Sequence, residues 1–151
     1  MTFRPLEVEI RFPVRAYDVD FTGIVSNITY IRWLEDLRLT VLEKYYPFPR
    51  LLAEGLSPIM MQTRIQYWKP VRMFDDPVGR MWLAEMQPVK ALLVASFSVG
   101  EQVAAYAEQL YCFVNTATGR PAEQPADFQR QYHAILQEHG GAPPARLTFK
   151  E

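Results

Sequence analysis

The sequence predicts an α+β domain in which an antiparallel sheet packs against one long helix. Several segments alternate apolar and polar residues with a period of two, which is typical of strands with one buried face. One segment repeats apolar residues every three or four positions, which is typical of an amphipathic helix. A tight connection at residues 100–102 joins two of the strands, as in antiparallel hairpins. With 151 residues, the chain is expected to form a single domain over residues 1–151.

The first strand is expected at residues 8–16, where apolar side chains occupy every second position. Pro13 lies within it, which favours an edge strand or a bulge. If the strand continued, Asp18 and Asp20 would follow its buried phase, and a buried acid needs partners or a raised pKa. The simpler interpretation is that both are turn acids that bond their own backbone before Gly23, which can adopt a positive φ.

The long helix is expected to follow this turn, with Ser26 or Asn27 as its N-cap and Pro47 beyond its end. Its free N-terminal N–H groups and positive dipole end suit developing negative charge near the two acids. Charged residues between the apolar positions suggest surface ion pairs, although Glu35 could also face a site. The expected ion pairs are Arg32–Asp36 and Glu35–Arg38, and the expected apolar face comprises Ile28, Ile31, Leu34, Leu37, Val41, Leu42 and Tyr45.

Four later strands are expected, at about residues 59–67, 78–87, 90–99 and 103–115, and a final helix at residues 125–139. The glycine- and proline-rich run that follows suggests a flexible tail over about residues 140–151. The last three strands are apolar on both faces, and one central helix covers only one face. We therefore expect other subunits to bury part of the second face.

Composition excludes several classes of function. A formal net charge of -1 leaves no electrostatic footprint for nucleic acid or an anionic membrane. Cys112, the only cysteine, lies in an apolar run and is expected to be a buried thiol. The only two histidines, His133 and His139, lie in a polar C-terminal segment, which argues against a nucleophile–histidine triad. No metal-ligand spacing, cofactor motif, signal peptide or membrane span is recognisable, so a cytoplasmic protein without a cofactor is expected.

The run Asp20-Phe-Thr-Gly-Ile-Val-Ser-Asn-Ile-Thr-Tyr30, followed by Arg32-Trp-Leu-Glu35 and Arg38, resembles the signature of the 4-hydroxybenzoyl-CoA thioesterase family of hotdog-fold proteins. Segments at residues 66–76 and 115–121 extend the resemblance over roughly residues 7 to 125. It implies a hotdog fold, an antiparallel five- to six-stranded sheet wrapped around one long central helix. It also implies homodimers, or tetramers that are dimers of dimers, with active sites between protomers.

The resemblance also implies roles for individual residues. Asp20 matches the catalytic carboxylate, and the backbone N–H of Asn27 matches the group that polarises the thioester carbonyl. Many members have His at the position of Asn27, and some have Asn at the position of Thr29. Asparagine in place of histidine at position 27 still provides the backbone N–H donor. Substrate contacts are implied at Gly23, Ile24, Val25, Tyr30 and Lys90, the last at a basic position. Independently of the resemblance, Arg64, Lys69, Arg72 and Arg120 are candidates to meet the phosphates of such a substrate, although each is more simply a solvated surface charge.

Together these observations predict an acyl thioesterase that hydrolyses an acyl-CoA or acyl-carrier-protein thioester to the free acid and the thiol. Asp20 would act as general base on water or attack the carbonyl directly, and the sequence leaves both routes open. The alternative is a non-catalytic acyl-CoA or acyl-carrier-protein binding module on the same fold, because fold alone does not establish function. A purely structural homo-oligomer is a third hypothesis.

Overall fold

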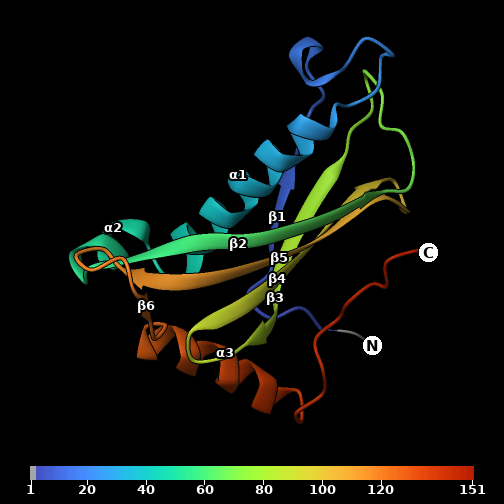
Figure 1. The fold of residues 1–151 in the computed structure, drawn as a ribbon. Helices are drawn as coiled ribbons and strands as arrows, with labels where there is room; N and C mark the ends of the chain where they lie inside the picture. Colours follow the sequence, from blue (N-terminus) through green and yellow to red (C-terminus); the bar gives the residue numbers. More distant parts are fainter. Residues whose placement is uncertain (1–2) are drawn as a thin grey trace.

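In the computed structural model, which describes residues 3–151, one antiparallel sheet has the strand order β1-β3-β4-β5-β2, and β6 pairs with β5 (Figure 1). The long helix α1 packs along one face of this sheet, which confirms the predicted α+β class. The strands are β1 Val8–Arg11, β2 Leu56–Tyr67, β3 Val78–Met86, β4 Lys90–Val99, β5 Gln102–Asn115 and β6 Pro121–Ala122. The helices are α1 Asn27–Tyr45, α2 Phe48–Ala53 and α3 Ala126–Glu138, with a 3₁₀ turn at Ala16–Asp18.

Strand β1 is shorter than the sequence predicted. It ends at Arg11, because Pro13 has no N–H to continue the ladder with β3. The alternation of burial nevertheless continues for a few residues, since Phe12 and Val14 are both buried. In the described part of the chain, β1 pairs only with β3 and therefore forms an edge of the sheet, as the proline indicated.

Helix α1 begins where the sequence placed it, but its apolar face is rotated from the expected one. Ser26 is the N-cap, and its Oγ accepts from the N–H of Ile28 at 3.2 Å. Ile28 and Ile31, two expected anchors, are 65% and 44% exposed. Aromatic residues replace them on the buried face: Tyr30 and Trp33 both pack against Phe97 of β4, with ring centroids 5.2 and 5.9 Å apart. The helix wheel allows only one face towards the sheet, so the two isoleucines point away from it.

The predicted final helix is confirmed as α3, which packs against one end of the sheet. Its Tyr132 hydroxyl donates to the carbonyl of Ala84 at 2.9 Å, and its Phe128 ring meets that of Tyr46 edge-on. Helix α2, which the sequence analysis did not predict, starts at Phe48 after Pro47. No helix of residues 3–151 combines the length and apolar character that crossing a membrane requires.

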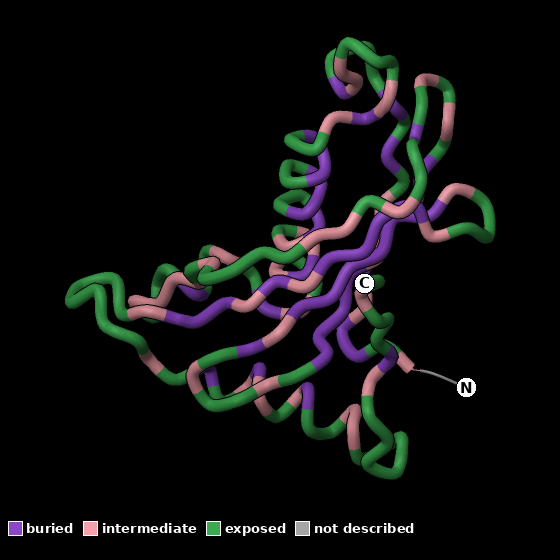
Figure 2. The backbone as a smooth tube through the Cα atoms, turned by 45° about the vertical axis from the view of Figure 1, so that its right-hand side comes forward, coloured by how far each residue is buried: buried purple, intermediate pink, exposed green. Residues whose placement is uncertain are grey.

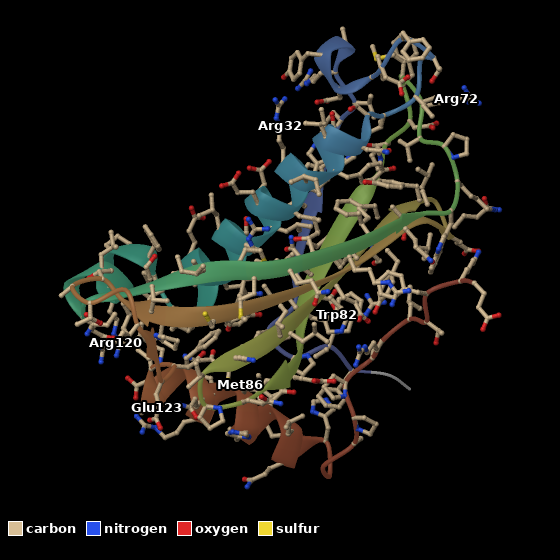
Figure 3. All side chains as sticks on the ribbon, in the orientation of Figure 1. Arg32, Arg72, Trp82, Met86, Arg120 and Glu123 are labelled. Atoms are coloured by element: carbon tan, nitrogen blue, oxygen red, sulfur yellow. The ribbon has the colours of Figure 1, made fainter. Side chains whose placement is uncertain are left out.

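Part of the second face of the sheet is covered from within the chain, and burial of this face by other subunits stays a prediction. Trp82 lies on this face and is 1% exposed, and its indole N–H donates to the carbonyl of Ala145 at 2.6 Å (Figure 3). Phe149 packs against Tyr106 with ring centroids 5.0 Å apart, and Arg146 binds two carboxylates of the sheet. The C-terminal segment therefore helps to bury the second face of these strands, which carry apolar side chains on both faces.

Candidate functional site

The acidic loop that precedes α1 is closed by backbone bonds at its base. Val19 and Val25 form an isolated antiparallel bridge, and the N–H of Asp20 donates to the carbonyl of Ile24 at 2.8 Å. Gly23 has a φ of +80°, the left-handed conformation expected for it. These bonds fold residues 19–25 into a narrow loop beside the first turn of α1, at the top of Figure 1.

Asp18 attaches this loop to the helix. Its carbonyl accepts from the N–H of Ser26 at 2.8 Å and from the hydroxyl of Thr29 at 3.0 Å. Its buried carboxylate accepts from the N–H of Arg15 at 2.8 Å. All three bonds are structural, and the carboxylate bonds the backbone three residues earlier, so Asp18 is a turn acid, as the simpler interpretation predicted. The threonine at position 29, where some family members have asparagine, supplies one of the bonds that fix the loop to α1.

Asp20 also makes turn bonds, but its carboxylate is accessible. Oδ1 accepts from the N–H and the hydroxyl of Thr22, at 2.8 and 2.5 Å. The hydroxyl bond, and after it the bond from the Thr22 amide, hold the pKa of Asp20 below its ordinary value; burial opposes them, and the Ile24 amide adds a smaller lowering effect. The group is therefore an anion at neutral pH, because the net shift of its pKa is downward and not upward, as burial on an extended strand would have required.

The first turn of α1 leaves one amide without a protein acceptor. The N–H of Ile28 donates to Ser26 Oγ, and those of Thr29 and Tyr30 donate to the carbonyl of Ser26. Within residues 3–151, the N–H of Asn27 has no such acceptor. A free N–H at the positive end of a 19-residue helix is a suitable donor for a negatively charged oxygen.

A hollow of about 200 Å³ has Asn27 among its lining residues. Tyr30 is 2% exposed, and burial, with a smaller contribution from Tyr67, raises the pKa of its hydroxyl, which therefore stays neutral. Lys69 provides the cationic group of the hollow. The lining residues are Ile24, Val25, Asn27, Tyr30, Tyr67, Trp68, Lys69, Pro70 and Val71. The structure thus brings four of the implied site residues to one hollow, with Gly23 and Asp20 on the adjoining loop.

Lys90 lies at the other end of the sheet. Phe97 of β4 contacts Tyr30 near the helix start, whereas Lys90 is the first residue of the same strand. Seven residues of extended chain separate them, which is about 23 Å. Figure 3 shows the same separation for two other basic candidates, since Arg72 lies near the acidic loop and Arg120 at the opposite end. Within one protomer, Lys90 does not reach the hollow.

The other carboxylates and the histidines do not add to this site. Glu85 and Glu108 bind Arg146 on the outer face of the sheet, at 2.8 and 2.7 Å. His133 and His139 belong to α3 and its C-cap. In the part of the chain that the structure describes, no group of three His, Cys, Asp or Glu side chains could hold a metal ion. Cys112 is buried in β5, as predicted.

A second hollow, which we call the distal pocket, was not predicted from the sequence. It has a volume of about 210 Å³ and is bounded by α1, α2, α3 and strands β2, β4 and β5. Glu35 and Arg38 lie in its wall, although the sequence suggested a surface ion pair between them. One signal was available: Arg38 follows Leu34 by four positions and precedes Val41 by three, which puts a charge on the buried stripe of the helix.

Comparison with known sequences identifies one family. The family model described as the thioesterase-like superfamily matches residues 14–132, which include the acidic loop, α1 and every strand of the sheet except β1. No curated protein matches the chain.

Solved structures share the fold at low sequence identity. A hypothetical protein from Staphylococcus aureus in complex with CoA has a TM-score of 0.83 and 11% identity, over 100% of this chain and 93% of that one. A DHNA-CoA thioesterase from the same species has a TM-score of 0.80 and 14% identity, over 93% and 99%. The probable thioesterase YbaW from Escherichia coli has a TM-score of 0.73 and 20% identity, over 83% and 94%.

Proposed function

The chain belongs to the thioesterase-like superfamily and is a thioester hydrolase, and from this premise we propose that it hydrolyses an acyl-CoA thioester at the start of α1. Asp20 is the reacting carboxylate, and the N–H of Asn27 is the oxyanion donor. The observation that carries the proposal is this amide, which has no acceptor within residues 3–151 and belongs to a residue that lines a hollow near an ionised aspartate. An acyl transfer needs both groups, a carboxylate to start the attack and a donor for the tetrahedral oxyanion.

The chemistry follows from these two groups. In the first route, Asp20 takes a proton from water, the water oxygen attacks the thioester carbonyl, and the oxyanion collapses to expel the thiolate, which is then protonated. In the second route, the carboxylate attacks the carbonyl itself, the thiolate leaves, and water hydrolyses the resulting anhydride. In both, the Asn27 N–H stabilises the oxyanion by about 3 kcal/mol. Single-turnover reaction in ¹⁸O-water separates them, because label in the Asp20 carboxylate excludes the simple base route.

Basic residues near the hollow favour a phosphate-bearing substrate. Lys69 lines the hollow, and Arg72 pairs with Ile24 of the acidic loop. The similar fold of a protein solved with CoA supports CoA as the thiol, and an acyl-carrier protein would present the same phosphopantetheine phosphate. The hollow accepts the thioester end of either substrate.

Strand β2 supports a homodimer. It is twelve residues long, and among residues 3–151 it pairs only with β5, so its other edge offers N–H and C=O groups that no strand of these residues pairs. Figure 2 shows that much of β2 is exposed or half-buried. Ile59 and Met61 on this strand are 45% and 48% exposed. Antiparallel pairing of two β2 edges about a two-fold axis would satisfy these groups and extend one sheet across both protomers. Light scattering of the purified protein tests the dimer, and Met61→Lys is expected to shift it towards the monomer.

The same dimer gives Lys90 a role. Lys90 pairs with Cys112, which also pairs with Ile59 near the start of β2. Tyr67, at the end of β2, lines the hollow at the helix start. Antiparallel pairing brings the start of one β2 beside the end of the other, so Lys90 would serve the site of the partner.

Thiol release from a panel of aliphatic and aromatic acyl-CoAs tests the proposed function. Asp20→Asn should lower kcat by at least about 100-fold in a folded protein, while binding of a thioether analogue persists. Asp36→Asn is the matched control, because Asp36 is an exposed carboxylate of α1 that lines neither hollow. Equal activity in Asp20→Asn and the native protein would refute the role of Asp20. Binding without any turnover would favour the non-catalytic module.

A further inference from the structure

The distal pocket is apolar except for a few groups. Its carbon lining comes from both layers of the domain: Val41, Leu42, Phe48, Leu93, Phe113 and Phe128. Two charged residues of α1 interrupt this lining, Glu35, which is exposed, and Arg38, which is half-buried. An apolar cavity with one convergent cation has the character of a binding site for an apolar group that ends in an anion.

The guanidinium of Arg38 is held by a single chain of hydrogen bonds. Nη1 donates to Oε1 of Gln109 at 2.9 Å, and Nε2 of Gln109 donates to the hydroxyl of Thr63 at 2.9 Å. Gln109 is 2% exposed, so this amide fixes the position of the arginine. Arg38 makes no ion pair with any carboxylate of residues 3–151, and most of its five N–H groups have no acceptor there.

The environment of Arg38 has an electrostatic cost. Burial lowers the pKa of its guanidinium, and the charge of Glu35 one turn earlier only partly opposes this effect. Arginine nevertheless stays charged, so a half-buried guanidinium without an anion is left with an incompletely compensated charge. A carboxylate is the partner whose geometry matches the guanidinium fork.

We propose that the distal pocket binds the acyl group of the substrate, and that Arg38 binds a carboxylate at the far end of that group. The proposal rests on the proposed function, and it makes Arg38 a specificity-determining residue that selects ω-carboxyacyl thioesters.

The volume of the pocket fits an acyl group of moderate size. An apolar cavity of about 150 Å³ accommodates benzene, so the cavity volume needed is about 25 Å³ for each carbon atom. The 210 Å³ of the distal pocket therefore accommodates about eight carbon atoms.

The position of the pocket indicates which protomer's bound substrate would enter it. Arg38 follows Asn27 by eleven helical residues, or about 16 Å, which an acyl group of this size does not span within one protomer. Ser57, Pro58 and Met60 of the distal pocket lie near the start of β2, and Tyr67 of the other hollow lies at its end. In the β2 dimer, the pocket of one protomer therefore lies towards the helix start of the other.

The phosphates of CoA are a second possible source of an anion for Arg38. The carbon lining and the neighbouring carboxylate of Glu35 argue against them, because a phosphate carries more charge and needs more polar partners than this pocket offers. A singly charged carboxylate on a carbon chain matches both the lining and the one cation.

Affinity for thioether analogues tests the proposal without requiring turnover. The probes are S-hexyl-CoA and S-(5-carboxypentyl)-CoA, together with the same two tails on N-acetylcysteamine, which has no phosphate. The measured quantity is the ratio of the two Kd values, plain tail over carboxylate tail. We expect a ratio of about 10 to 100 in the native protein and in Arg130→Met, a control on α3. The ratio should fall to about 1 in Arg38→Met and be intermediate in Arg38→Lys.

The outcomes are distinct. A ratio near 1 in the native protein would overturn the proposal, as would an unchanged ratio in Arg38→Met. An equal loss of affinity for both CoA analogues in Arg38→Met, with none for the N-acetylcysteamine compounds, would assign Arg38 to the phosphates and also overturn it. Hydrolysis of hexanoyl-CoA by the native protein is measured separately, so a failure of the thioesterase function is not confused with a failure of the carboxylate preference. Circular dichroism of each variant confirms that it is folded.

Discussion

Gly79→Ala is expected to destabilise the contact between α1 and the sheet, although alanine is normally the better strand residue. Gly79 is buried in β3 beneath the helix. A Cβ at this position would lie 2.6 Å from Cε2 of Phe12, 3.1 Å from Cε1 of Phe97 and 3.2 Å from Cδ1 of Leu37. Carbon atoms pack best at about 3.5 to 4.0 Å, so all three neighbours would have to move.

The magnitude follows from two opposing effects. Overpacking a core costs about 1 to 3 kcal/mol, and alanine gains about 0.5 to 1 kcal/mol over glycine through the unfolded chain. The Phe12 ring cannot retreat easily, because it stacks on Trp33 at 4.9 Å and also faces Phe97. We therefore expect the overpacking cost to lie near 3 kcal/mol, at the top of its range, which leaves a net loss of about 2 kcal/mol in the free energy of unfolding and lowers Tm by about 4 to 8 °C for a chain of this size.

Urea and thermal unfolding, followed by circular dichroism, measure this loss. The matched experiment is a double-mutant cycle with Phe12→Leu, which removes the ring that the new methyl group meets first. The double variant should be more stable than the sum of the single effects predicts, by about 1 kcal/mol. Equal or greater stability of Gly79→Ala, or strict additivity in the cycle, would refute the reasoning.

Two further predictions concern the acidic loop and the C-terminal segment. Thr22→Val removes the hydroxyl bond that contributes most to the low pKa of Asp20. The pKa of Asp20 should therefore rise, and the acid limb of the pH profile of kcat/KM should move to higher pH. An acid limb at unchanged pH would contradict the role of Asp20 as the ionised group. Ending the chain at Pro144 removes the residues that cover Trp82. The free energy of unfolding should therefore fall by about 2 to 3 kcal/mol, and tryptophan fluorescence should shift to the red. An unchanged free energy of unfolding would instead fit a flexible tail over residues 140–151.

The acidic loop was predictable because its determinants are local. Asp20, Gly23, the cap at Ser26 and the amide of Asn27 lie within eight residues, and turn and capping rules act over such spans. The rotation of α1 was less predictable, because isoleucine and aromatic positions compete for the same face. Tyr30 and Trp33 occupy it through contacts with Phe97, a residue more than sixty positions away.

The chain of hydrogen bonds from Arg38 through Gln109 to Thr63 could not be read from the sequence, because each residue lies on a different element. The sequence alone suggested a local ion pair with Glu35, the commonest arrangement for such spacing on a helix. In the described residues this pair does not form, since the guanidinium turns towards β5.

The sequence by itself determined the α+β class, the long helix, most of the strands and the acidic loop with its capped helix start. Only the tertiary structure decided the strand order, the free edge of β2, the cover of the outer face by the C-terminal segment, and the separation of Lys90 from the helix start. The physical reason is that hydrophobic periodicity and turn chemistry report which side of a segment is apolar. They do not report which distant segment meets that side, because burial is a property of the assembled chain and not of any one segment.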